Sequence, residues 1–422
     1  MVAVLAVALL AWPGGTGSPS QPGTPARRPV VPSTVYEPRF WQPTVQDSPE
    51  GAASMLFSGS GAGLGGIYYQ SNVAVVAAGG SYRMLLGEMN LQAGTDALLS
   101  PDGSHVALSW SATHGSPLDA FSSGASVWVA DLGTGKVRRY RLPGDLDAAN
   151  AVPLGWSPDG HHVALSWRGD LVEGSDRVTA TLALLDVSSG AVRSLGHFSL
   201  GQDGELNPAF SPDGRRVAVQ AGSDLSVIDT TTGATRRLPE LGPRQRLAGP
   251  GAWSTDGTRL AIATFDGCAT GCRPEQFDAR RWQLSYLDPG SGATAAGPAF
   301  DPIDAMVVRV LGWQAGGDVV ALTYRCSSPP DYPAYDSDLY RPRLVALHPG
   351  GGQRNLIALP DYVRRIDIAH DAVTADRFGG PAPRPAALPL AHWVYRVAAV
   401  LVAGFAVLLT LVVVVVRRVR RR

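Results

Sequence analysis

The stretch WSPDGHHVALSW, residues 156–167, joins a tight turn to an alternating apolar run. In S-P-D-G, proline fixes φ at the second turn position, aspartate can bond its own backbone, and glycine takes a position of positive φ. The run that follows has a period of two and is rich in β-branched residues, so we expect a strand rather than a helix. The stretch therefore predicts one antiparallel hairpin.

Close copies of this stretch recur along the chain. They are LSPDGSHVALSW from Leu99, FSPDGRRVAVQ from Phe210, WSTDGTRLAIATF from Trp253 and the weaker LGWQAGGDVVALTY from Leu311. The turn residues that we interpret as structural are Asp102, Gly103, Asp159, Gly160, Asp213, Gly214, Asp256 and Gly257. A second apolar run and a D-x-x-x-G turn follow each S-x-D-G copy, as in SVWVADLGTGKVRRY from Ser126. Each unit therefore holds two hairpins, or four antiparallel strands.

Repeated four-stranded units predict a six-bladed β-propeller, because such sheets bury both faces only by packing around a central axis. Five units and a degenerate N-terminal one, ASMLFSG to YRMLL, give six blades, and seven is the alternative. A last strand, VRRIDIAHDAV from Val363, is expected to close the ring against the N-terminal blade. A β-sandwich is the structural runner-up. The aromatic residues before the turns, Trp156, Trp253, Trp313 and Phe210, are expected to pack between blades.

The repeated W/F-S-P-D-G-x-x-[VL]-A unit, with its apolar strand and D-x-x-x-G turn, resembles the TolB-like and WD-repeat-like β-propellers of bacterial envelope proteins. The resemblance covers about residues 50–375. It implies the fold but no specific activity, because binding propellers and the propeller domains of peptidases share the motif.

Composition divides the chain into six segments. We expect a hydrophobic signal-like segment at 1–12, a Pro/Gly/Ser-rich linker at 13–50, the β-propeller at 51–376, a second linker at 377–391, a transmembrane helix at 392–416 and a cytoplasmic Arg tail at 417–422.

The uncharged run from Val397 to Val416 is long enough to cross a hydrocarbon core of about 30 Å. Trp393 and Tyr395 lie at one end like an aromatic belt, and the arginine tail lies at the other. By the positive-inside rule the tail is cytoplasmic and the propeller is extracytoplasmic, in a single-pass protein of the cell membrane. The apolar N-terminal run, interpreted as an export signal, agrees with this topology.

The charge of the chain argues against a nucleic-acid partner. The whole chain has 36 Lys and Arg against 36 Asp and Glu, but five arginines lie in the tail. The remainder is slightly acidic, so it offers no basic face to a nucleic acid.

Function is expected on one face of the propeller. The two kinds of short turn share a face, whereas the longer connections between the second and third strands of each blade open on the other. The most suggestive of these is DYPAYDSDLY, in which Tyr332, Tyr335, Asp336, Asp338 and Tyr340 combine flat amphipathic area with hydrogen-bond acceptors. The alternative is a solvated loop that covers the blade edge.

Three cysteines, Cys268, Cys272 and Cys326, allow one disulfide in an extracytoplasmic domain. A small loop closed by Cys268 and Cys272 and a bridge from Cys268 to Cys326 are both open. We find no H-E-x-x-H or G-x-S-x-G motif and expect no catalytic, cofactor-binding or metal-binding residue.

The leading hypothesis is thus a binding module for a protein, peptide or cell-envelope ligand. A propeller enzyme of lactonase or lyase type, with residues converging on the central channel, is the alternative. An accessory subunit of a membrane signalling complex is the second alternative, and it needs a partner because the tail is too short to fold.

Overall fold

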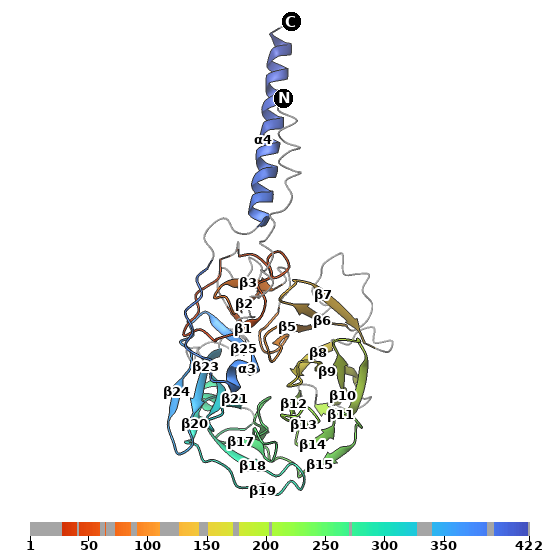
Figure 1. The fold of residues 1–422 in the computed structure, drawn as a ribbon, viewed down its shortest axis with the longest axis vertical. Helices are drawn as coiled ribbons and strands as arrows, with labels where there is room; N and C mark the ends of the chain where they lie inside the picture. The colour runs from red at the N-terminus through yellow and green to blue at the C-terminus, as the bar shows by residue number, and fades with distance from the viewer. Residues whose placement is uncertain are drawn as a thin grey trace.

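A computed structural model describes residues 28–39, 42–59, 64, 72–85, 91–109, 126–142, 151–171, 177–201, 205–269, 272–326, 340–385 and 392–420. Its strands form six antiparallel sheets arranged around a central axis, which confirms the six-bladed β-propeller (Figure 1). Neither seven blades nor a sandwich fits this topology. The N-terminal segment 1–12 lies outside the described residues.

Blades 2 to 6 each use consecutive strands, and in Figure 1 the first strand of a blade lies near the axis and the last at the rim. Blade 2 consists of β4 (Ala97–Leu99), β5 (His105–Ser109), β6 (Ser126–Asp131) and β7 (Val137–Arg141). Blade 3 consists of β8 (Ala151–Trp156), β9 (His162–Leu171), β10 (Arg177–Asp186) and β11 (Val192–Gly201). Blade 4 consists of β12 (Leu206–Phe210), β13 (Arg216–Ala221), β14 (Asp224–Asp229) and β15 (Thr235–Arg237).

Blade 5 has an additional strand. It consists of β16 (Gln245–Leu247), β17 (Leu260–Asp266), β18 (Arg281–Leu287), β19 (Thr294–Ala295) and β20 (Ile303–Asp304), which pairs with β18. Blade 6 consists of β21 (Val307–Trp313), β22 (Val319–Cys326), β23 (Tyr340–Leu347) and β24 (Gln353–Asn355).

Blade 1 joins the two ends of the propeller sequence. Its outer strands are β1 (Ala53–Gly59), β2 (Val73–Ala77) and β3 (Tyr82–Leu85), and its innermost strand is the C-terminal β25 (Val363–Ile368). β25 pairs antiparallel with β1, with Phe57 opposite Ile366. The expected closing strand therefore ends at Ile368, and the chain continues as the short helix α3 (His370–Thr374).

The repeated turns lie on one side of the ring, the turn face. In the first of them the Asp102 carboxylate accepts hydrogen bonds from the Ser104 backbone N–H (2.9 Å) and the Ser100 hydroxyl (2.7 Å). The same pair of bonds recurs at Asp159, Asp213 and Asp256. These bonds lower the pKa of the turn aspartates, although partial burial opposes them. The turns are thus internally satisfied and need no outside ligand.

Tryptophans link neighbouring blades. The indole Nε1 of Trp156 donates to the carbonyl oxygen of Leu98 in the preceding blade (3.0 Å). Trp253 and Trp313 make the equivalent bonds to Ala209 (2.9 Å) and Gly251 (3.0 Å). Buried apolar side chains fill the seams on both sides of each sheet. The aromatic position is therefore part of the scaffold.

Residues 28–39 and 42–50 belong to a segment that composition assigns to a linker, yet they pack on the propeller; we call residues 30–39 and 42–50 the N-terminal arm. Val31, Val35 and Val45 are buried. Val31 exchanges backbone hydrogen bonds with Arg377 and Gly380, and Val45 bonds to Met84 on the outer strand of blade 1. The linker assignment is therefore wrong for this part. Composition does not predict this packing, because only a few valines and single backbone hydrogen bonds attach the arm to the propeller.

The last element, α4 (His392–Val419), is the one described helix that is long and apolar enough to cross a membrane. None of its apolar window is buried against the rest of the chain. All strands of the described residues lie within 53–368, and none of the buried core residues comes from α4.

Candidate functional site

The strand order places the connections between second and third strands on the side opposite the turns, the loop face. These connections differ from blade to blade. In blade 3 the expected loop is largely an extended hairpin, because β9 and β10 run on to Leu171 and Arg177. In blade 4 only Gly222 and Ser223 join the two strands.

Most of the predicted site lies outside the described residues. Tyr332, Tyr335, Asp336 and Asp338 belong to 327–339, of which the structure gives no description. Tyr340 begins β23 and lies opposite Cys326 in the sheet register. The two ends of this connection are therefore side by side, at the loop face of blade 6.

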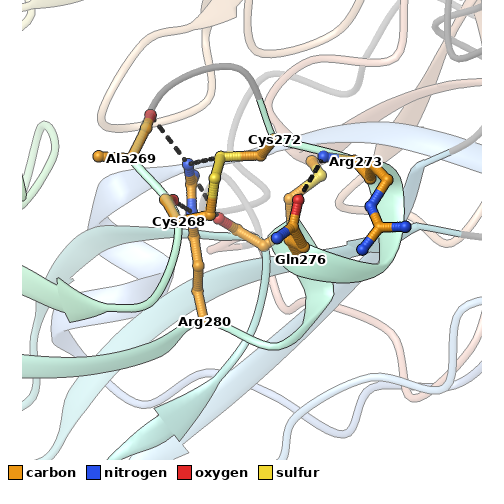
Figure 2. Close-up of a disulfide and its surroundings, with 7 residues drawn as sticks. Cys268, Ala269, Cys272, Arg273, Gln276 and Arg280 are labelled. Carbon is orange, nitrogen blue, oxygen red and sulfur yellow. Dashed lines mark hydrogen bonds between the residues drawn. A yellow bond between two sulfur atoms is a disulfide. The ribbon is translucent and has the colours of Figure 1, made fainter.

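The corresponding connection of blade 5 is a disulfide-closed loop between β17 and β18. A disulfide joins Cys268 to Cys272, and the helix α2 (Pro274–Asp278) follows it (Figure 2). Gln276 caps this helix by accepting a hydrogen bond from the Arg273 backbone N–H at 2.9 Å. The spacing of the cysteines in the sequence allows either this disulfide or a bridge from Cys268 to Cys326, and the structure has the former.

Arg280 ties the disulfide-closed loop to the sheet. Its Nε donates to the Cys268 carbonyl oxygen at 2.9 Å, and its Nη2 lies 3.8 Å from the Cys272 Sγ (Figure 2). The guanidinium lies 4.3 Å from the ring centroid of Phe265 and 4.5 Å from that of Phe277. Such contacts between cations and aromatic faces strengthen when water is excluded.

This arginine is enclosed, with 8% of its surface exposed. Burial lowers its pKa, and the positive charge of Arg246 lowers it further. A buried cation is costly unless dipoles surround it, and here carbonyl oxygens of the loop supply them. Arg280 therefore acts as a structural centre for the loop.

The disulfide-closed loop also contacts blade 6. The helix α2 packs against β22, and the backbone N–H of Ala305, between β20 and β21, donates to the Arg280 carbonyl oxygen at 3.2 Å. Because β22 ends at Cys326, the disulfide-closed loop lies beside the root of the 327–339 connection. We call residues 266–281 together with Arg325 and Arg341 the blade 5–6 surface.

The outer side of the blade 5–6 surface is polar. Its exposed polar and charged residues are Asp266, Arg273, Glu275, Gln276, Arg281, Arg325 and Arg341, and Gly267 and Ala279 are exposed beside them. Arg281 pairs with Asp304 and Arg341 with Asp361, so part of this charge is already neutralised. Mixed charge on a rigid, covalently closed loop suits recognition of a polar partner better than capture of an apolar small molecule.

A second polar cluster lies near the axis. Asp367 on β25 is half-buried, and the surrounding protein raises its pKa to about 6 by desolvation. Hydrogen bonds from the backbones of Leu99 and Ile368, and the charge of Arg309, oppose this rise. The carboxylate is thus held by backbone donors, which indicates a structural role. Among the described residues no three His, Cys, Asp or Glu side chains converge as a metal site would require.

Comparison with known proteins gives structural likeness only. No protein-family model matches the chain, and no curated protein matches it. A TolB-type protein from Agrobacterium tumefaciens is 17% identical, with 76% of this chain and 99% of that chain covered and a TM-score of 0.40. An oligogalacturonate lyase in complex with manganese is 13% identical, with 76% and 77% covered and a TM-score of 0.43. A puromycin hydrolase is 16% identical, with 81% and 55% covered and a TM-score of 0.35. These values say nothing about what this chain binds.

Sequence reasoning did not identify Arg280 or Asp367. Arg280 follows α2 in a segment without periodicity, and its aromatic partners are on either side of the disulfide-closed loop. Asp367 lies in an ordinary apolar strand pattern, VRRIDI. Alternation places Asp367 on the face of Arg365, opposite Ile366 and Ile368, so the strand pattern gave no signal for its enclosure.

Proposed function

We propose that this chain is a membrane-tethered, extracytoplasmic binding module that takes a protein, peptide or cell-envelope ligand through the blade 5–6 surface. The observation that carries the proposal is the contrast between the two faces. The turn face repeats one short motif whose polar groups bond each other. The loop face carries a loop fixed by a disulfide and a buried arginine.

The undescribed connection 327–339 and the first residue of β23, Tyr340, supply the recognition chemistry in this proposal. Tyr332, Tyr335 and Tyr340 offer large contact area at low entropic cost, and Asp336 and Asp338 offer acceptors. The connection starts next to the disulfide-closed loop, so a partner can touch both. Functional residues commonly lie on such loops over a rigid scaffold.

The membrane assignment rests on α4 and its flanks. The helix is apolar and exposed, Trp393 and Tyr395 lie in its first turns, and arginines follow its end. This arrangement supports a cytoplasmic C-terminus and an extracytoplasmic propeller.

The test uses site-specific photo-cross-linking of the full-length protein in its native membrane. One photoreactive residue replaces the exposed Glu275 on α2, and a matched one replaces the exposed Thr231 in a turn of blade 4 on the turn face. We expect a discrete adduct from position 275 and none from position 231.

A second variant carries serine at Tyr332, Tyr335, Asp336 and Asp338, which keeps the loop length and leaves β23 intact. We expect this variant to lose the adduct from position 275. An adduct of equal strength from position 231, or one that survives the serine substitutions, would contradict the proposal. A membrane protein as the adduct would identify an accessory subunit, whereas a soluble protein or polymer would identify a receptor.

A further inference from the structure

Two exposed apolar side chains stand out on the N-terminal arm. Outside α4, the large hydrophobic residues that are exposed among the described residues are Val30 (41%) and Tyr36 (49%). Between them Val31 and Val35 are fully buried, so the arm is fixed rather than loosely attached. Val30 and Tyr36 are therefore apolar side chains held outward on an ordered segment, and their position relative to α4 decides what they can contact.

The arm lies where the chain leaves the propeller. The backbone N–H groups of Val31 and Ser33 donate to Arg377 and Gly380, and a side chain on Gly380 would press against Val30. Six residues on, the backbone N–H of Tyr36 donates to the hydroxyl of Tyr82 on β3, at the rim of blade 1. Val30 and Tyr36 thus flank the outer edge of the seam between blades 6 and 1.

A short tether connects this edge to α4. Residues 381–391 separate Gly380 from the first residue of the helix, and four of them are prolines. Even fully extended, this segment reaches about 40 Å. If α4 spans a bilayer, the arm is therefore held close to the surface of that bilayer throughout.

The chemistry of the arm matches a membrane interface. Tyrosine places an apolar ring and a polar hydroxyl at the headgroup level, and arginine side chains reach anionic headgroups. Arg39 on the arm and Arg384 on the tether are both exposed.

We propose that the arm residues Val30 and Tyr36 rest on the bilayer that α4 crosses, so that lipid headgroups are the partner of this edge. The ring then stands on its rim at blades 1 and 6, and neither its turn face nor its loop face is covered by lipid. This inference rests on the membrane anchorage of the proposed function, and it adds an orientation that leaves the blade 5–6 surface open to a partner.

The test measures the depth of single fluorescent labels in full-length protein, reconstituted in vesicles of phosphatidylcholine and phosphatidylglycerol. Cys326→Ala removes the thiol outside the disulfide, and an environment-sensitive dye is then placed at V30C, Y36C, F405C or T235C. Thr235 is on β15 of blade 4, on the opposite side of the ring, and Phe405 is within α4. Lipids with a quencher near the headgroup report contact with the interface.

We expect strong quenching at positions 30 and 36, none at position 235, and deep insertion at position 405. If the label at position 405 inserts but the labels at positions 30 and 36 are quenched no more than the label at 235, the inference is overturned and the membrane anchorage still stands. A label at 405 that remains in water would instead overturn the anchorage on which the inference rests.

A second measurement avoids replacing the contact residues by labels. Vesicle co-sedimentation of the propeller fragment 28–385, which contains every strand and its core, compares the native sequence with Val30→Ser/Tyr36→Ser. We expect about tenfold weaker binding for the double variant, from the loss of buried apolar area. A matched Thr231→Ser/Thr235→Ser variant should bind like the native fragment. Equal binding by all three fragments would overturn the inference.

Discussion

The Oδ2 atom of Asp367 accepts a hydrogen bond from the Leu99 backbone N–H at 2.7 Å, across 268 residues of sequence. The bond joins the closing strand of blade 1 to the innermost strand of blade 2. At three other seams an indole from the following blade supplies the link, but blade 2 has Leu99 and blade 4 has Phe210 in place of tryptophan. Between blades 1 and 2, the hydrogen bond to the carboxylate of the closing strand therefore takes the place of the indole hydrogen bond.

Stability should fall with rising pH through the titration of Asp367. Its pKa rises from an ordinary 3.8 to about 6 in the folded protein, chiefly through burial. A raised carboxyl pKa gives stability that is fully present below about pH 4 and is lost as the pH passes through 6. The loss is about 3 kcal/mol at most. Asp367→Asn keeps an acceptor for the Leu99 N–H and cannot ionise.

The measurement is urea unfolding of the 28–385 fragment and its Asp367→Asn variant from pH 4 to pH 8. The difference between the two unfolding free energies should change between pH 4 and 6 and stay level above that range. Parallel curves over the whole range would show that Asp367 does not titrate with a raised pKa.

Two glycines of the same motif should respond very differently to alanine. Gly103 and Gly160 both have positive φ, 78° and 72°. A Cβ on Gly103 would overlap the carbonyl oxygen of Ala53 at the start of β1, whereas the nearest atom to one on Gly160 is Pro101 Cδ at 3.9 Å. Gly160→Ala should cost about 1 kcal/mol from backbone strain alone. Gly103→Ala should cost clearly more, because blades 1 and 2 must separate. Equal melting temperatures for the two variants would refute the difference.

The indole hydrogen bond between blades should be separable from the packing of its ring. Trp156→Ala should lower the free energy of unfolding by about 3 to 5 kcal/mol, as a large buried side chain is lost. Trp156→Phe keeps most of the packing and leaves the Leu98 carbonyl without its indole donor, which should cost about 1 to 3 kcal/mol. Denaturant unfolding of both variants checks this order. A phenylalanine variant as stable as the native protein would mean that water replaces the indole.

Opening the disulfide should have a local effect. The bond closes a very short loop, so Cys268→Ser/Cys272→Ser should cost about 2 kcal/mol or less. Hydrogen exchange should quicken in residues 266–281 and in 303–306, which bonds to Arg280, and stay unchanged in blades 2 and 3. Arg280→Met, which removes the charge but keeps an apolar stem, should quicken exchange in the same segments. Protection unchanged in both variants would show that neither group holds the loop.

The repeated motif allowed the ring to be predicted from sequence, because each S-x-D-G turn and its strand obey local rules. Features formed by distant residues escaped prediction. Val31 and Val45 lie in a proline-rich segment that resembles a linker, and only the paired strands around them make those positions interior. Arg280 needed Phe265 and Phe277 in place before its burial could be inferred. The recognition residues of 327–339 were chosen from composition alone and stay a prediction.

The closing strand β25 also sets the order in which the molecule can be completed. During synthesis β1 is made early, but its inner partner β25 is made only after the strands of the five other blades. Over that time one edge of the first sheet has unsatisfied backbone groups, the kind of edge that pairs with other chains. The partner strand comes shortly before α4, so ring closure becomes available only as the chain approaches this last helix. A product truncated anywhere before Val363 would keep this edge open and exposed to pairing with other chains.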